Sequence, residues 1–169
     1  MTVRFGAVLL ATFAVGCGGS SVPTASSSST DSGPSDIAHD FATPEGAILS
    51  LEDAYRNRDV EAAVKCKDFE TEAQIMLSKL QGNLGDDPEV KKQTTEVLEL
   101  SFRQELKQTG FPDFRNLVSS FSAPEPYGGR DDIVRIKEIC AHSNGTTTTN
   151  VLHCAKRGNV WKVVTILEE

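Results

Sequence analysis

Several features that would assign a function directly are missing from this sequence of 169 residues. Its four cysteines include no close Cys-x-x-Cys pair, which argues against a thioredoxin-type redox motif and against a zinc ribbon. A Ser-His-Asp order, a nucleophile elbow, a phosphate loop and a calcium loop are all absent. Positive charge is scarce, because 17 Lys and Arg residues stand against 24 Asp and Glu residues. This acidic balance argues against nonspecific nucleic-acid binding and against a domain that lies on an anionic membrane.

Apolar runs are also rare, and one run near the N-terminus stands out. Residues 5–15 contain no charged side chain and follow a short start that carries Arg4. The run is shorter than the roughly 20 apolar residues that a membrane-spanning helix needs. A charged start, a short apolar core and small residues after it are typical of a secretory signal. No other segment is apolar enough to be expected to span a membrane.

The residues that end this run, Ala14-Val15-Gly16-Cys17, resemble the lipobox of bacterial lipoproteins. In that family the chain is cut just before the cysteine, and the cysteine carries fatty acyl chains such as palmitate. The resemblance implies a signal peptide over residues 1–16 and lipid attachment at Cys17. Ala14 departs from the leucine that the family prefers, so an ordinary signal peptide that happens to contain a cysteine is the alternative.

The same resemblance implies a location in the bacterial cell envelope, on the exported side of a membrane. Gly18, rather than Asp, follows the cysteine, which is similar to the outer-membrane sorting pattern of cells with two membranes. Several acyl chains on one residue would anchor the protein stably. Loss of Arg4 with the signal would take the net charge from −7 to −8.

The mature chain is expected to consist of a tether and one domain. Residues 17–39 are rich in Ser and Thr and hold few apolar side chains, so they predict a flexible tether. Residues 40–169 are enough for a single domain with one core.

The first half of this domain predicts four helices. Thr43-Pro44-Glu45 and Asp87-Pro88-Glu89 each place an N-cap side chain, a proline and an acid in the order that favours a helix start. The first helix is expected to end near Asn57, and a short second helix is capped by Asp59. A third helix covers residues 73–80 and stops at Gly82, and the fourth helix ends at Gly110.

The second half predicts strands. Residues 133–140, 146–154 and 160–167 are rich in β-branched residues, and turn signals at 144–145 and 157–159 separate them. Residues 114–121 are apolar but do not indicate a type of element, and residues 123–130 predict a loop. Helices followed by an antiparallel sheet indicate an α+β domain.

This order of elements resembles the nuclear transport factor 2-like superfamily, an α+β cone with N-terminal helices packed on a curved antiparallel sheet. The resemblance rests on residues 43–55 with 58–64, which look like the opening helices of exported members, and on residues 158–164, which look like the closing strand. Residues 82–112 fit least well, because their helix is long for the superfamily.

The resemblance implies two functions. One is a noncatalytic envelope lipoprotein whose domain binds a partner protein or a small apolar ligand, with no cofactor. The alternative is a small enzyme similar to ketosteroid isomerase, with an acid or a phenol inside the cone. The available candidates are Asp53, Tyr55, Asp113 and Asp132, and none lies in a motif that matches those enzymes. We therefore favour the noncatalytic interpretation.

A group of potential soft-metal ligands lies in the predicted strands: Cys140, His142, His153 and Cys154. Neighbouring residues of a strand point to opposite faces, so His153 and Cys154 cannot both join the other two. We therefore predict no metal site.

The same strands raise the question of a disulfide between Cys140 and Cys154. A hairpin that closes tightly on residues 144–145 would place Cys140 opposite Thr149, too far from Cys154 for a bond. A wide loop over residues 143–150 would bring the two cysteines together, and a bond from Cys66 on the second helix to a cysteine of the sheet is a further alternative. We favour three unpaired cysteines, and Cys140–Cys154 is the preferred pair if a bond exists.

Overall fold

The computed structural model describes residues 39–80 and 84–166. The predicted signal peptide, Cys17 and nearly all of the tether lie outside the described residues, as do Gly82 and Leu167. The described residues form four α-helices, a short 3-10 helix and five strands. In chain order they are α1 (Pro44–Arg56), α2 (Val60–Lys65), α3 (Phe69–Ser78), η1 (Leu84–Asp86), α4 (Pro88–Thr109), β1 (Leu117–Phe121), β2 (Glu125–Tyr127), β3 (Arg130–His142), β4 (Thr147–Arg157) and β5 (Val160–Val164).

The helix starts are set by the local chemistry that the sequence predicts. The Thr43 hydroxyl accepts a hydrogen bond from the Gly46 amide at 3.0 Å, and Pro44 occupies the first turn of α1. Asp59 and Asp87 cap α2 and α4 in the same way. Gly110 ends α4 with a φ of 85°, a left-handed conformation that glycine adopts at low cost.

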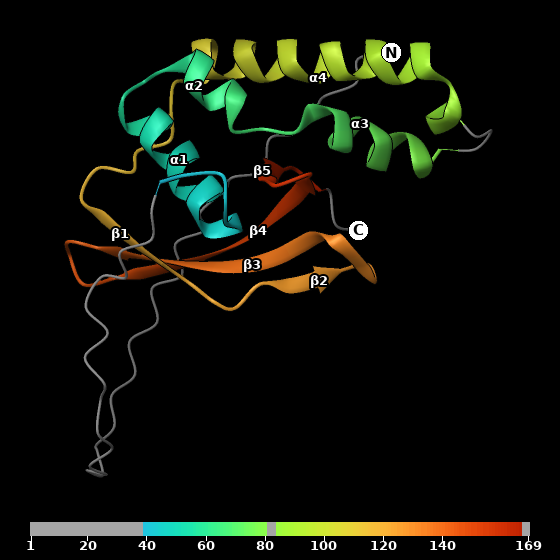
Figure 1. Ribbon diagram of the computed structural model, residues 1–169. Coiled ribbons are helices and arrows are strands. Elements are labelled where there is room, and N and C mark those ends of the chain that lie inside the picture. The colour runs from blue at the N-terminus through green and yellow to red at the C-terminus, as the bar shows by residue number, and fades with distance from the viewer. Residues whose placement is uncertain (1–38, 81–83, 167–169) are drawn as a thin grey trace. The chain divides into compact units, whose positions relative to one another are not determined.

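The five strands form one antiparallel sheet in which β3 is central (Figure 1). β4 pairs with one edge of β3, and both β1 and β2 pair with the other edge, while β5 continues the sheet beyond β4. Residues 114–121, for which the sequence does not indicate a type of element, therefore contain the strand β1. The prediction of a loop over 123–130 is wrong in part, because Glu125–Tyr127 pairs with β3 despite Pro126. Proline is tolerated there because β2 lies at a sheet edge.

The outer edge of β5 is covered by the N-terminal half of the domain. The Trp161 amide donates to the Phe41 carbonyl at 2.8 Å, and the Val163 amide donates to the Cys66 carbonyl at 2.9 Å. The Asp68 amide donates back to the Val163 carbonyl at 3.0 Å. Segments about 100 residues apart in sequence are thereby joined by main-chain hydrogen bonds.

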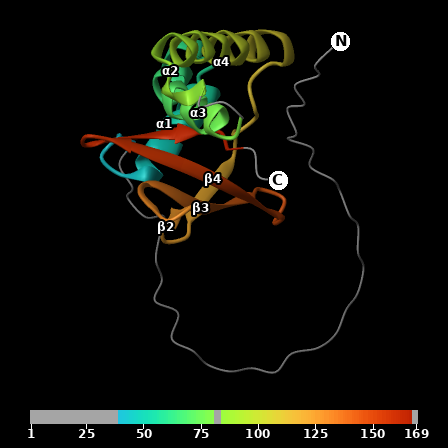
Figure 2. The same cartoon turned by 90° about the vertical axis from the view of Figure 1, so that its right-hand side faces the viewer.

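The helices lie on one face of the sheet, and α4 lies across α2 and α3 rather than on the sheet itself (Figures 1 and 2). The predicted fold class, an α+β domain with N-terminal helices on a curved antiparallel sheet, is confirmed. The core lies between α1, α2 and the inner face of β3, β4 and β5, and it includes Ile48, Leu51, Ala63, Val134, Ile136, Cys154 and Val163. Among the described residues, no helix is both long and apolar enough to cross a membrane.

The β3–β4 hairpin is tight but differs by one residue from the predicted register. Cys140 lies opposite Thr148 instead of Thr149, because the loop between His142 and Thr146 holds three residues rather than two. Cys154 lies opposite Val134, six positions along β3 from Cys140. The thiols of Cys66, Cys140 and Cys154 are all buried and unbonded to one another in this structure.

A buried ion pair joins the start of α3 to the segment after β5. The Lys67 ammonium contacts the Glu72 carboxylate and donates to the Thr165 hydroxyl at 2.6 Å. The Thr165 amide donates to Glu72 at 2.6 Å. The side chains of Lys67 and Glu72 are only 5% and 8% exposed, so each ion relies on the other for compensation.

Candidate functional site

Two buried carboxyl groups meet between α1 and the inner face of the sheet. Glu52 and Glu138 are 2% and 1% exposed. Glu52 follows Leu51 on the side of α1 that packs against the sheet. Glu138 stands between Ile136 and Cys140 in the set of alternate β3 residues that point inward. Helix period and strand alternation thus place both acids in the core, where an ionised carboxylate requires hydrogen-bond partners.

The Ser119 hydroxyl on β1 bridges the two acids. Its oxygen lies 2.9 Å from Oε1 of Glu52 and 2.8 Å from Oε1 of Glu138. A hydroxyl has one proton to donate, so both contacts are hydrogen bonds only when one glutamate is protonated and donates. The other oxygen of Glu138 accepts from the Asn150 amide nitrogen at 2.9 Å. The geometry is that of a carboxylic acid linked to a carboxylate through the Ser119 hydroxyl.

Burial and proximity assign the proton to Glu52. Burial, the hydrogen bond to Glu138 and the repulsion between the two groups raise the pKa of Glu52 from 4.5 to about 8. Burial disfavours the charge of Glu138 as well, but hydrogen bonds from Glu52, Asn150 and Ser119 hold the pKa of Glu138 below its ordinary value. At neutral pH the pair therefore carries one negative charge.

Arg56, one turn along α1 from Glu52, connects the acid pair to the surface. Its guanidinium donates to Glu52 at 2.7 Å and to Asp53 at 2.5 Å, and its Nε donates to the Phe114 carbonyl at 3.2 Å. The Arg56 side chain is 28% exposed, whereas that of Glu52 is 3% exposed. The guanidinium is thus in contact with both the buried acid and solvent.

A pocket of about 500 Å³ opens beside Arg56, at the junction of α1 with the segment that precedes β1. This volume is within the usual range of small-molecule sites. The pocket is lined by Tyr55, Arg56, Arg58, Phe111, Pro112, Asp113, Phe114 and Arg115.

One wall of the pocket is aromatic. The Tyr55 ring stacks on Phe114 with 5.9 Å between centroids and meets the edge of Phe111 at 6.1 Å. Burial raises the pKa of the Tyr55 phenol above its ordinary value, so this side chain stays neutral. The rings pack on one another and add a smaller, apolar share to a lining that is mainly polar, and they bring no negative charge.

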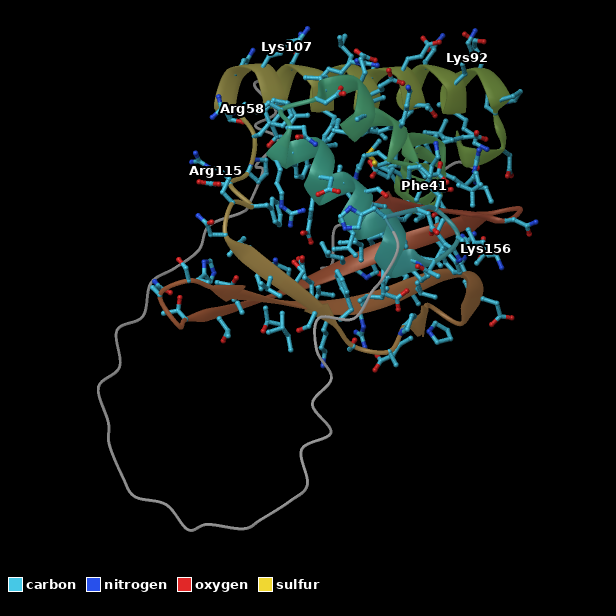
Figure 3. The ribbon with its side chains drawn as sticks, turned by 60° about the vertical axis from the view of Figure 1, so that its left-hand side comes forward. Phe41, Arg58, Lys92, Lys107, Arg115 and Lys156 are labelled. Atoms are coloured by element: carbon cyan, nitrogen blue, oxygen red, sulfur yellow. The ribbon has the colours of Figure 1, made fainter. Side chains whose placement is uncertain are left out.

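The rim of the pocket is basic. Arg58 and Arg115 project from the same side of the molecule (Figure 3). Arg58 adopts a φ of 55° because it follows the C-cap of α1: its amide donates to the Tyr55 carbonyl and the Asp59 amide donates to the Ala54 carbonyl, the hydrogen bonds of a Schellman motif. Arg115 pairs with Asp113 through two hydrogen bonds at 2.9 and 2.8 Å, which hold the pKa of the Asp113 carboxyl well below its usual range. With Arg56, which pairs with Asp53, three arginines line the opening.

The acids and the phenol predicted as candidates do not form this pair. Asp53 contacts His39 and Arg56 at the surface of α1. Asp113 is exposed, and so is Asp132, which pairs with Arg130 at 2.9 and 2.5 Å. Of the four predicted candidates, Tyr55 and Asp113 line the pocket and Asp53 and Asp132 do not. The acids that meet inside the domain are instead two glutamates, Glu52 and Glu138, which are not among those candidates.

The predicted group of soft ligands is divided by the sheet. Cys140 and His142 share the inner face of β3, and His142 is near the Thr148 hydroxyl at 3.2 Å. His153 follows the opposite phase of β4 and packs against Tyr127, with ring centroids 4.6 Å apart. Within residues 39–80 and 84–166, no group of three or more potential ligands is placed to hold a metal ion.

Comparisons with known proteins give one similar fold. No protein-family model matches the chain, and no curated protein sequence matches it either. A solved structure from Campylobacter jejuni, described as an NTF2-like transpeptidase, is similar over 73% of this chain and 99% of its own, with 14% identity and a TM-score of 0.37.

Proposed function

We propose that this protein is a noncatalytic binding domain that takes a small organic anion with an aromatic or apolar body in the Arg56 pocket. The observation that carries the proposal is the pairing of an aromatic wall with three arginines, Arg56, Arg58 and Arg115, in a chain of net charge −7. Because the protein as a whole is acidic, a cluster of arginines at one place is not a result of its overall composition. Such a cluster favours the binding of an anion.

The chemistry of the pocket matches two parts of such a ligand. Guanidinium groups bind carboxylates through planar, paired hydrogen bonds. The partly exposed rings of Tyr55, Phe111 and Phe114 offer a small apolar surface against which one side of the ligand can pack. The expectation of a small apolar ligand is thereby refined to an anion with an apolar part.

Benzoate is the simplest probe of this proposal. Isothermal titration calorimetry should show saturable binding of benzoate but not of benzylamine, which has a similar ring and the opposite charge. Arg115→Gln should weaken benzoate binding about tenfold or more, because a hydrogen bond to a charged group contributes about 1.5–3 kcal/mol.

A matched control is available on the same chain. Arg130 forms the same two-hydrogen-bond pair with Asp132 that Arg115 forms with Asp113, but it does not line the pocket. Arg130→Gln should leave benzoate affinity unchanged. Equal affinity for benzoate and benzylamine, or no binding of either, would contradict the proposed function.

We also propose that the domain is anchored to a membrane in the cell envelope through lipid on Cys17. The support is the Ala14-Val15-Gly16-Cys17 sequence, the apolar run before it and the Ser/Thr-rich tether after it. Expression in a bacterial host with labelled fatty acid should label the protein, and Cys17→Ser should abolish the label. Labelling of the serine variant to the same extent would refute the anchor.

The acid pair favours a second candidate function, general acid–base catalysis of the ketosteroid isomerase type. A glutamic acid with a pKa near 8 beside an ionised partner is suited to proton transfer near neutral pH. Against it, Glu52 and Glu138 are almost completely buried, so a substrate would have to displace Arg56 to reach them. Isomerisation of a β,γ-unsaturated ketone, lost in Glu52→Gln, would establish this alternative.

A further inference from the structure

Arg56 belongs to two sites at once. It lines the pocket, and it donates a hydrogen bond to the protonated member of the buried acid pair. An anion in the pocket would therefore compete with Glu52 and Asp53 for the same guanidinium. Competition for one cation is a physical route by which two sites influence each other.

We propose that Arg56 couples anion binding in the pocket to protonation of the Glu52–Glu138 pair, so that the anion binds together with a proton. This inference rests on the proposed function and adds the regulation of that site. The Ser119 contacts already require one proton on the pair in the free protein. When the guanidinium turns toward a ligand, Glu52 loses its nearest cation, and its neutral form is favoured further.

Glu52 has a pKa of about 8, and the other groups of the described residues that face the pair are few. From α1 this is Arg56, from β1 Ser119, from β4 Asn150 and from β3 Cys140, while Asp53 contacts Arg56 from the surface. Burial raises the pKa of the Cys140 thiol to about 11, above the range of interest. His142 bonds to Thr148 farther along the sheet, and His39 contacts Asp53 on the outer side of α1.

The direction of the pH dependence follows from these roles. Below pH 7 Glu52 is already protonated and holds Arg56 only weakly, so affinity for the anion is highest and independent of pH. As the pH rises through about 8, Glu52 ionises and holds Arg56 by charge as well. Affinity should then decrease, with about tenfold per pH unit as the upper limit for one linked proton.

Calorimetry of benzoate binding at pH 8 in Tris and in triethanolamine measures the proton directly, because the two buffers differ in ionisation enthalpy. We expect a measurable uptake of less than half a proton at pH 8, the midpoint of Glu52, and almost none at pH 6.5. The full-length lipid-free protein, with Cys17 replaced by serine, is suitable for the titrations.

Two amide variants should shift the pH profile in different ways. Glu52→Gln mimics the protonated acid, so benzoate should bind with no proton uptake and with an affinity that does not decrease above pH 8. Glu138→Gln removes the anion and the hydrogen bond that keep Glu52 neutral, so the decrease in affinity should begin at a lower pH. Glu125→Gln, on the outer face and paired with Arg135, should behave as the wild type. His39→Asn should also keep the wild-type profile.

The outcomes separate this inference from the function on which it rests. Benzoate binding without proton uptake, or the same pH profile in all variants, overturns the coupling and leaves the binding function intact. Absence of benzoate binding at every pH overturns both. Proton uptake that disappears in Glu52→Gln and moves to lower pH in Glu138→Gln supports the coupling.

Discussion

Substitution of Lys67 by methionine is expected to lower the free energy of unfolding by about 3–5 kcal/mol, the usual cost of removing one partner from a buried ion pair. Methionine keeps the length and apolar stem of the side chain, so the loss comes from the uncompensated charge of Glu72. Urea denaturation at pH 7 measures the change as a shift of the midpoint at constant slope.

Lys65 provides the comparison, because it is on the same segment but exposed. Lys65→Met should change the free energy of unfolding by less than about 0.5 kcal/mol. A second variant, Lys67→Met with Glu72→Gln, removes both charges and should recover part of the loss. Similar small changes for Lys67→Met and Lys65→Met would show that the ion pair does not stabilise the domain.

Ile136→Ala should destabilise the domain by about 2–5 kcal/mol, because it leaves a cavity in the core. Ile136 is 0% exposed on the inner face of β3, whereas Ile139 on the outer face of the same strand is 43% exposed. Ile139→Ala is therefore the matched control, with the same atoms removed and little burial lost. Thermal unfolding of both variants distinguishes the two faces, and equal losses would contradict the assignment of the inner face.

The parts of the fold that depend on local chemistry could be predicted from the sequence. Helix caps at Thr43, Asp59 and Asp87 are signals within a few residues, and the structure places helices where they indicate. β2 could not be predicted because a segment of three residues that includes a proline is too short to show the alternation of a strand. Only its pairing with β3 makes it a strand. The register of the β3–β4 hairpin differed because a two-residue and a three-residue turn can be built from the same Asn-Gly signal.

The acid pair was missed for a different reason, although a signal was present. Glu52 is four residues after Ile48, on the apolar stripe of α1, and Glu138 stands between Ile136 and Cys140 in the inward phase of β3. An acid in an apolar phase is the pattern that predicts a buried carboxyl group. Their meeting depends on how α1 crosses the sheet, which no local pattern contains. The pocket likewise depends on the approach of residues 111–115 to α1.

The bonds from β5 to Phe41, Cys66 and Asp68 have a consequence for the order of folding. They join the beginning of the described domain to its last strand, and α1 packs on β5 as well. Contacts between residues so far apart in the chain form late and slow the folding of a domain. The α1 and α2 helices therefore cannot complete their packing until residues 160–164 have been synthesised. A nascent chain would therefore expose the apolar faces of α1 and β3 until β5, the last described strand, is available.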